Sequence, residues 1–277
     1  KKMKQKKILV VQGGVSSERE ISLRSGKACI RAIKQLKNKV IIFDPAKKHF
    51  SKIKQYKKKV DLIFNALHGR DGEDGVAQSY FEYFKIPYTH SGVTSSMNAM
   101  DKIISKKFFK KNRLLTPNHI SLNSISYKQK LKEKNLKNSN LNYPVVVKPS
   151  NEGSSIGVEI CKNFSQLKLF VGKLIKNYKS LIIENYIPGK EIQVAVINGK
   201  ALGAIELQPR RKFYDYKAKY SKSALTRHIM PANLSKKNYQ KVLKLGEKVH
   251  QLLKCRGVTR SDFKFVDNKF YLLEINT

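Results

Sequence analysis

The chain changes its pattern of strands and helices partway along its length, and this change limits the folds that it can adopt. Over roughly the first third, apolar strands alternate with helical segments, which predicts a parallel sheet with right-handed crossovers. These strands read KKILVVQGG, VIIFD and VDLIFNALHG, with IPYTH as a short further strand. Later strands follow one another as hairpins, from PVVVKPS to KALGAIELQP, and end in a pair around the turn Asp267-Asn268. The expected fold is an α/β parallel-sheet domain followed by an α+β part.

Helical segments separate the strands, and their ends carry recognisable signals. Ser16 or Ser17 is expected to cap the first helix, with Glu20 completing a capping box after Ser17, and this helix is expected to run to about Leu36. Further helices are predicted for VAQSYFEYFK, for MDKIISKKFFKKN and near residues 235–254. The polar, low-complexity stretch LKEKNLKNSNLN is expected to be a mobile loop or a frayed helix.

The chain is strongly basic: 57 Lys and Arg residues against 20 Asp and Glu residues give a formal net charge of +37. A basic chain can bind nucleic acid by neutralising phosphates, or it can simply carry lysines on solvated faces. The lysines occur in every region, without an aromatic-interleaved stripe or a nucleic-acid motif, so we expect no specific nucleic-acid partner. Eleven of the 20 acidic residues, in contrast, lie in or beside Gly-rich or polar stretches, where they indicate a chemical role.

Cysteine spacing and hydropathy exclude several classes of protein. Cys29, Cys161 and Cys255 lie far apart without a CxxC pair, so they indicate neither a disulfide framework nor a zinc site. They are expected to be reduced, mostly buried thiols. No apolar run approaches the roughly 20 residues that span a bilayer, and the basic start KKMKQKK lacks the apolar core of a signal peptide. The chain is therefore expected to be cytoplasmic, without a membrane partner.

The stretch YPVVVKPSNEGSSIG places a lysine at the end of a strand, just before a hydroxyl-rich glycine loop. In a Walker-type phosphate loop the lysine follows the last glycine and a helix begins there. Lys148 instead precedes Gly153 and Gly157, and the chain then returns to a strand. The unit is either a plain hairpin or a loop that delivers Lys148 to a ligand.

Three further stretches concentrate polar side chains at the ends of strands or helices. HGRDGEDG is either an elaborate turn or a site, and His68 within it is more typical of a neutral hydrogen-bonding group than of a metal ligand. Glu18 in GGVSSERE either caps a helix or holds a substrate ammonium group. Glu184 and Glu191 flank a Pro-Gly turn, where two carboxylates suit hydrogen bonds to a ribose or a purine amine.

The last two strands carry Arg260 and Asp262 on one strand, and Glu274 and Asn276 on its neighbour. Because side chains two apart in a strand share a face, the four groups are expected to meet. Two carboxylates and an amide oxygen are hard ligands that fit Mg²⁺ bound together with substrate phosphates. The alternative is a surface salt-bridge cluster.

Taken together, these stretches resemble the D-alanine–D-alanine ligase family of the ATP-grasp superfamily. The matching strings occur in family order along essentially the whole chain: ILVVQGGVSSEREISLRSG, ALHGRDGEDG, IPYTHSGVTSSMNAMDK, YPVVVKPSNEGSSIG, FYDYKAKY and DFKFVDNKFYLLEINT. The resemblance implies an ATP-grasp fold in which two subdomains clamp ATP. It also implies a Rossmann-like domain over residues 1–97, a central subdomain over 98–184 and a C-terminal subdomain over 185–277.

The resemblance also implies roles for individual residues. Asn185 departs from the family pattern, because lysine is common at this position in the family. Glu18 would bind the ammonium group of the first D-alanine and His68 would lie near its carboxylate. Arg260 would stabilise the oxyanion, while Ser154 and Tyr220 would bridge two lid loops. Two Mg²⁺ or Mn²⁺ ions would be held by Asp262, Glu274 and Asn276. ATP would be bound by Lys102, Lys148, Ser154, Ser155, Glu184, Asn185, Ile187, Glu191 and Lys219.

The implied reaction joins two D-alanines with ATP, through a D-alanyl phosphate, and supplies a peptidoglycan precursor. D-alanine–D-lactate and D-alanine–D-serine ligases share the donor chemistry, and Tyr220 in FYDYKAKY favours the dipeptide ligase. The family forms homodimers. Its chains continue past the final NT with a segment that binds the acceptor carboxylate, so this chain is expected to be incomplete at its C-terminus. A basic, non-enzymatic nucleic-acid-binding protein is the remaining alternative.

Overall fold

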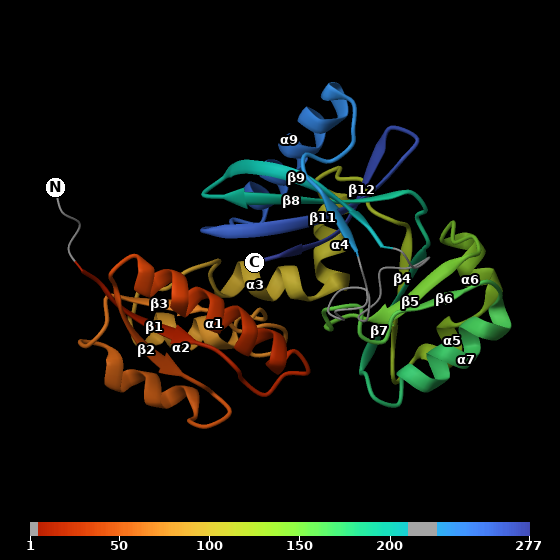
Figure 1. Cartoon of the computed structure of the whole chain (residues 1–277). Coiled ribbons are helices and arrows are strands. Elements are labelled where there is room, and N and C mark those ends of the chain that lie inside the picture. The colour runs from red at the N-terminus through yellow and green to blue at the C-terminus, as the bar shows by residue number, and fades with distance from the viewer. Residues whose placement is uncertain (1–4, 210–225) are drawn as a thin grey trace.

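The computed structural model describes residues 5–209 and 226–277, and within them the chain forms a parallel sheet and two antiparallel sheets (Figure 1). The parallel sheet has the order β2-β1-β3, as the alternating pattern predicts. IPYTH adds only an isolated bridge between Ile63 and Tyr88. The elements of this part are β1 (Lys7–Val11), α1 (Arg19–Gln35), β2 (Lys39–Phe43), the 3₁₀ helix η1 (Phe50–Tyr56), β3 (Leu62–Asn65) and α2 (Val76–Tyr83).

The expected capping box at the first helix is wrong. Helix α1 begins after Glu18, and the side chain of Glu18 makes no capping hydrogen bond. The Ser16 hydroxyl donates to the backbone oxygen of His68 at 2.7 Å and accepts from the Glu18 N–H at 3.2 Å. Ser17 is exposed to solvent. Ser16 therefore joins this turn to the loop after β3. This contact between distant segments replaces the helix cap that the local sequence predicted.

The second sheet is antiparallel, with the order β4-β7-β5-β6. One of its two inner strands, β5, is buried along its whole length, which explains the run of valines before Lys148. The low-complexity stretch forms a short helix, α6, whose Leu136 is buried in the core of this sheet. The elements are β4 (His119–Asn123), α5 (Tyr127–Lys130), α6 (Glu133–Asn138), β5 (Val145–Pro149), β6 (Glu159–Cys161), α7 (Phe164–Leu174) and β7 (Ser180–Asn185).

The third sheet, also antiparallel, has the order β10-β9-β8-β11-β12. Helix α9 packs closely on it through Gly246, where a Cβ atom would come within 2.6 Å of Val194. Asp267 and Asn268, both with positive φ, form the two-residue turn of the last hairpin. The elements are β8 (Lys190–Ile197), β9 (Lys200–Gln208), β10 (Arg227–Ile229), α9 (Lys236–Leu252), β11 (Val258–Val266) and β12 (Lys269–Asn276).

Two helices, α3 (Val93–Met100) and α4 (Lys102–Lys111), lie between the three sheets (Figure 1). Asp101 caps α4 by accepting hydrogen bonds from the Ile103 and Ile104 amides. Ala99 and Phe109 are buried in the core of the third sheet, together with residues such as Val194. The first residues after position 97 thus pack on the C-terminal sheet, and the division at 1–97, 98–184 and 185–277 stays a prediction.

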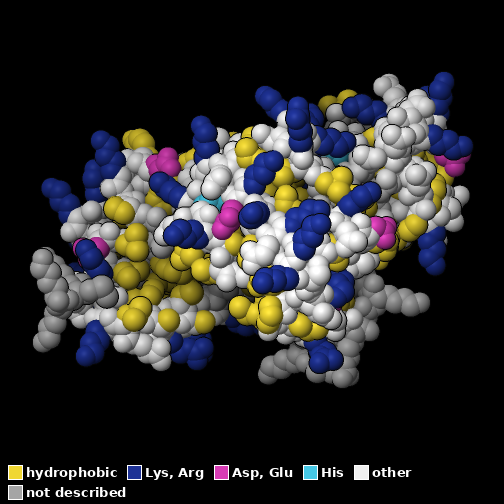
Figure 2. Space-filling view, turned by 90° about the horizontal axis from the view of Figure 1, so that it is seen from above, with side chains coloured by type: hydrophobic (Ala, Val, Ile, Leu, Met, Phe, Trp, Pro, Cys, Tyr) yellow, Lys and Arg dark blue, Asp and Glu magenta, His cyan; other side chains and the backbone are white. Residues whose placement is uncertain are grey.

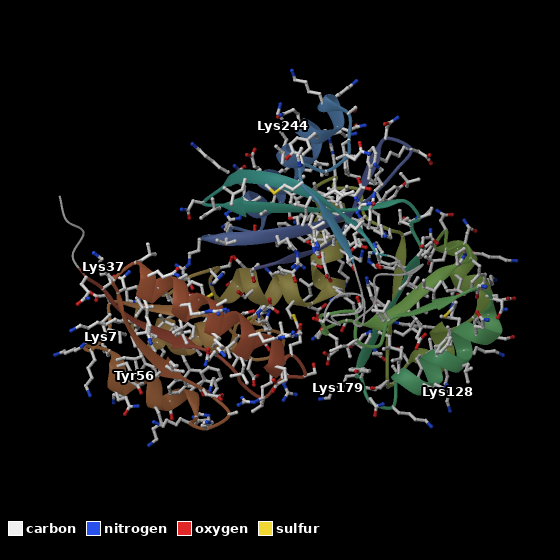
Figure 3. All side chains as sticks on the ribbon, viewed as in Figure 1. Lys7, Lys37, Tyr56, Lys128, Lys179 and Lys244 are labelled. Atoms are coloured by element: carbon white, nitrogen blue, oxygen red, sulfur yellow. The ribbon has the colours of Figure 1, made fainter. Side chains whose placement is uncertain are left out.

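Charged side chains are spread over the regions built around all three sheets (Figure 3). Three of the lysines labelled in Figure 3 illustrate this spread: Lys7 is in β1 of the first sheet, Lys128 is in α5 near the second sheet, and Lys244 is in α9 on the third sheet. Figure 2 shows Lys and Arg scattered over one face between apolar and neutral groups. Among the described residues, no helix is both long and apolar enough to cross a bilayer. The three cysteines are unpaired, as predicted, with Cys161 buried and the other two partly buried.

Candidate active site

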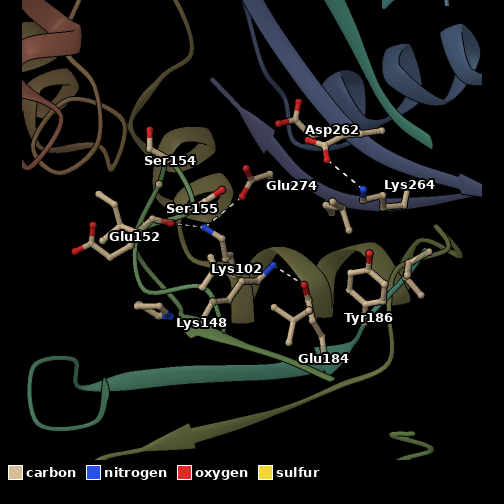
Figure 4. A pocket seen from close by; sticks show the side chains of 18 of the residues that line it. Lys102, Lys148, Glu152, Ser154, Ser155, Glu184, Tyr186, Asp262, Lys264 and Glu274 are labelled. Carbon is tan, nitrogen blue, oxygen red and sulfur yellow. Dashed lines mark hydrogen bonds and ion pairs between the residues drawn. The ribbon is translucent and has the colours of Figure 1, made fainter. Parts of the chain in front are cut away.

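A cavity opens between the loop after β5 and the strands β11 and β12 (Figure 4). It holds about 820 Å³ of empty space, its open mouth included. Most of the predicted site residues meet there. Those that line it are Lys102, Lys148, Ser154, Ser155, Glu184, Asn185, Ile187, Glu191, Asp262 and Glu274. Lys219 and Tyr220 lie outside the described residues.

The loop after Lys148 is held over one side of the cavity by contacts with distant parts of the chain. Lys102 donates to the backbone oxygen of Glu152 at 2.6 Å. The Ser154 hydroxyl contacts the Glu18 carboxylate. Ser154 and Ser155 both have positive φ, 52° and 62°, a conformation that costs about 1–3 kcal/mol at each non-glycine residue. This backbone therefore depends on its contacts, which favours the ligand-loop interpretation over a plain hairpin.

Glu18 is almost fully buried, 4% exposed, where two glycine-containing loops converge. A Cβ atom would come within 2.6 Å of the Glu18 carboxylate if placed on Gly69, and within 2.8 Å if placed on Gly153. Both loops can approach Glu18 this closely only because they have no side chain there. Glu18 thus joins the first domain to the loop over the cavity, and its carboxylate is turned toward that loop instead of capping α1.

His68 behaves as a neutral hydrogen-bonding group. Its Nε2 lies 3.0 Å from the Ser25 hydroxyl. Burial lowers the pKa of His68, and Arg260 lowers it further against the attraction of Glu18. This arrangement agrees with the preference for a hydrogen-bonding His68 over a metal ligand.

Glu184 lines the cavity and lies between two lysines. Its carboxylate contacts Lys148 and lies 2.9 Å from the Lys106 ammonium group. Burial alone would raise the pKa of Glu184, but the two cations outweigh it and lower the pKa to about 2. Sequence reasoning missed Lys106, although it follows Lys102 by four residues and so lies on the same face of α4.

Asp262 and Glu274 face each other as register partners on β11 and β12. Asp262 accepts two hydrogen bonds from Arg260, at 2.8 and 2.9 Å, and Glu274 lies 3.3 Å from the Lys102 ammonium group. The Arg260 side chain is 45% exposed, and its pairing with Asp262 raises its pKa above its ordinary value. The predicted meeting of these groups is thus present. Asn276 is less central, because it donates to the Arg260 backbone at 3.5 Å and lines a smaller, adjoining cavity.

A β-bulge beside this pair changes the alternation of β12. The register shifts between Asp262 and Phe263, so that Phe263 faces Leu272 and no residue pairs with Leu273. Leu273 and Glu274 both line the cavity although they are neighbours in sequence, while Leu272 is buried in the core. The bulge therefore turns Glu274 toward the cavity without moving the apolar residues of the strand out of the core.

Two further side chains at the site were given no role by the sequence analysis. Lys264 lines the cavity and lies 3.2 Å from Glu191, its register partner on β8. Glu73, in HGRDGEDG, accepts from the Gly69 amide at 2.7 Å and lines the smaller cavity. Burial raises the pKa of Glu73 to about 7, and the charges of Glu18 and Glu274 add to this effect. Period-two alternation from Asp262 was a signal for Lys264.

The candidate metal donors are two carboxylates and an amide. Among residues 5–209 and 226–277, no three His, Cys, Asp or Glu side chains are arranged to hold a metal ion. Five of the described residues that line the cavity are carboxylates and three are lysines. In a chain of net charge +37 this local excess of carboxylates is unusual. It fits a divalent cation whose remaining ligands come from phosphate oxygens and water.

Comparison with known proteins assigns the chain to a family. A model described as "D-ala D-ala ligase C-terminus" matches residues 108–277, and one described as "D-ala D-ala ligase N-terminus" matches residues 45–91. A D-alanine–D-alanine ligase of Pelagibacter ubique (strain HTCC1062) is 53% identical over 272 residues, which are 98% of this chain and 88% of that protein. One of Rickettsia felis is 40% identical, covering 98% of this chain and 82% of the relative.

Solved structures agree with this assignment. A crystal structure of the D-alanine–D-alanine ligase from Bacillus anthracis has a TM-score of 0.85 and 32% identity, covering 98% of this chain and 86% of that one. The VanG D-Ala:D-Ser ligase from Enterococcus faecalis has a TM-score of 0.82 and 25% identity, covering 99% and 90%. The parallel sheet followed by two antiparallel sheets is therefore the ATP-grasp architecture expected from the sequence, and the chain belongs to the D-alanine–D-alanine ligase family.

Proposed function

We propose that the protein ligates two D-alanines to D-alanyl-D-alanine with ATP, releasing ADP and phosphate, and so supplies a peptidoglycan precursor. Family membership and relatives named as this ligase support the proposal. The single observation that carries it is the cavity in which two lysines, Lys102 and Lys148, face the carboxylate pair of Asp262 and Glu274. Cations for phosphates and oxygen ligands for a metal are the two requirements of phosphoryl transfer.

The ATP phosphates would lie against Lys102 and Lys148, under the loop that carries Ser154 and Ser155. Backbone amides and hydroxyl groups of this loop can follow the charge of the moving phosphoryl group. Glu191, with Lys264 beside it, would hold the ribose hydroxyls, while Asn185 and Ile187 would lie near the adenine. Glu184 is less accessible than expected for an adenine contact, because its carboxylate is engaged by two lysines.

Asp262, Glu274 and Asn276 would hold divalent cations, and we propose two Mg²⁺ or Mn²⁺ ions. Such ions neutralise the charge on the phosphate oxygens during transfer. Each carboxylate is paired in the structure with a protein cation, Asp262 with Arg260 and Glu274 with Lys102. These ion pairs support the proposal that the two carboxylates bind positive charge.

The first D-alanine would be held by Glu18 at its ammonium group, with His68 near its carboxylate. Its carboxylate oxygen attacks the γ-phosphoryl group, which gives D-alanyl phosphate and ADP. The amine of the second D-alanine then attacks the acyl carbon, and phosphate leaves. Arg260 would neutralise the oxyanion formed in this second step. Roles for Lys219 and Tyr220 in a second lid loop remain predictions of the family resemblance.

The test is ADP release by the purified protein with ATP, Mg²⁺ and D-alanine, together with mass spectrometry of the product. We expect ADP release to require D-alanine and the product to be the dipeptide. Release that is independent of D-alanine contradicts the proposal. A second candidate, ligation of D-alanine to D-serine, follows from the similarity to VanG. A mixture of D-alanine with D-serine or D-lactate shows which acceptor is preferred.

We also propose that the protein is a cytoplasmic homodimer, as the family resemblance implies. Light scattering after size exclusion tests the dimer, since a monomeric mass at micromolar concentration contradicts it.

A further inference from the structure

Lys106 is a fully buried cation that the proposed mechanism does not use. Its side chain has no solvent exposure, and it lies on α4 one turn after Lys102. Its ammonium group lies 2.9 Å from Glu184 and donates to the Thr116 hydroxyl at 2.9 Å. An ammonium group is costly to bury unless it is paired and hydrogen-bonded. The fold therefore stabilises a buried charge next to Glu184, which lines the cavity.

Glu184 is shared between Lys106 and Lys148, and the sharing sets the charge of the cluster. Each lysine contacts a different carboxylate oxygen, so one negative charge serves two positive charges and the cluster keeps a net charge of +1. Lys148 lines the cavity, whereas Lys106 is beneath it. Without Lys106, Glu184 and Lys148 would form a neutral pair, and an incoming phosphate would meet no net charge from this side.

We propose that Lys106 is a positioning residue for nucleotide binding: by sharing the Glu184 carboxylate, it leaves Lys148 with net positive charge toward the phosphates and fixes the place of its ammonium group. This inference rests on the proposed ATP-binding function of the cavity. Positive charge in a site of low dielectric acts strongly on phosphates. The effect should therefore depend on the phosphates of the ligand and not on its base or sugar.

The alternative is that Lys106 has a purely structural role, and its hydrogen bond to Thr116 supports this alternative. The Thr116 hydroxyl, which accepts from Lys106, donates to the backbone oxygen of Leu272 at 2.8 Å. This bridge connects α4 with β12, two residues before Glu274. Removing Thr116 breaks the bridge without changing any charge, so Thr116→Val is the matched control for Lys106→Met.

The experiment measures dissociation constants for ATP with Mg²⁺ and for adenosine, by calorimetry, in the wild type and in each variant. For Lys106→Met we expect ATP binding to weaken by about tenfold, which corresponds to about 1.4 kcal/mol, with adenosine binding unchanged. Thr116→Val should leave the ratio of the two constants unchanged. Lys106→Met combined with Glu184→Gln should restore the ratio, because Lys148 then again contributes a net charge of +1.

Glu184→Gln alone provides a test that does not alter Lys106, and the ratio should then favour ATP more strongly than in the wild type. The proposal is overturned if Lys106→Met or Glu184→Gln weakens ATP and adenosine binding by the same factor, or if Thr116→Val reproduces the effect of Lys106→Met. A wild-type protein that binds no ATP contradicts the proposed function itself. A wild type that binds ATP, with a ratio unaffected by Lys106→Met, contradicts only the role of Lys106.

Discussion

Replacing Glu73 by glutamine should change how the stability of the protein depends on pH. Burial raises the pKa of Glu73 from its ordinary 4.5 to about 7. The folded protein therefore binds an extra proton between pH 4.5 and pH 7. The stability linked to a raised pKa is fully present at pH values below the pKa of the group in the unfolded chain. It is lost as the pH rises through the pKa of the group in the folded protein. In Glu73→Gln no ionisation occurs, and this loss should disappear.

The size of the effect follows from the shift. A difference of 7 − 4.5 = 2.5 units at about 1.36 kcal/mol for each unit gives an upper limit of about 3 kcal/mol. Solvent reaches part of the side chain, so the measured change should be smaller than this limit. Glutamine keeps an oxygen that can accept from the Gly69 amide, as Glu73 does at 2.7 Å. The substitution thus changes the charge with little change in shape.

Urea unfolding at pH 5 and pH 8, with EDTA and without nucleotide, measures this directly. We expect Glu73→Gln to gain stability relative to the wild type between pH 5 and pH 8, by up to about 3 kcal/mol. Glu133→Gln, at an exposed position on α6, is the matched control and should show no such gain. If the difference between Glu73→Gln and the wild type is the same at both pH values, Glu73 is ionised in the folded protein and the reasoning is refuted.

Other predictions concern the metal, the charge and the loop. Asp262→Ala and Glu274→Ala should each abolish metal-dependent ATP turnover while the circular dichroism spectrum stays unchanged, because each removes a carboxylate that we propose as a metal ligand. Near-normal turnover in either variant would contradict the metal assignment. DNA binding should be weak, without sequence preference, and should fall steeply between about 50 and 200 mM salt, whereas nanomolar, sequence-selective binding would show a nucleic-acid function. Amides in residues 150–157 should gain protection from hydrogen exchange when ATP and Mg²⁺ are added. Ordering roughly ten residues costs on the order of 10 kcal/mol of backbone entropy, which contacts with the ligand must offset. Equal protection with and without the ligand would identify a rigid hairpin.

The sequence predicted most strands because their signals are local. Alternation, valine runs and turn residues identified β1, β2, β3 and the later hairpins, and the turn Asp267-Asn268 is where it was expected. The capping box was wrong because Ser16 bonds to His68, which is distant in sequence. Polar residues at strand ends likewise indicated the cavity. Core packing does not need carboxylates or lysines at these positions, so their presence points to a binding or catalytic role.

Side chains that act through other side chains could not be predicted. In the sequence, Lys106 does not differ from the other lysines of a basic helix. The role proposed for it depends on its contacts with Glu184, which lies on β7, and with Thr116, which lies in the segment before β4. Glu73 was visible in a polar motif, but its raised pKa depends on burial by the folded protein. Such roles arise only when separate parts of the chain are brought together.

The bulge between Asp262 and Phe263 has a consequence for how the chain tolerates insertions and deletions during evolution. Loss of Leu273 would remove only the unpaired residue, so that Glu274 would follow Leu272 directly, still opposite Asp262 and still on the face away from the core. Extra residues at Asp267-Asn268, beyond the end of the hairpin, would leave the register between Asp262 and Glu274 intact. Alignment gaps among related chains should therefore gather at the hairpin tip and at the position of Leu273, and be absent at the paired positions between them.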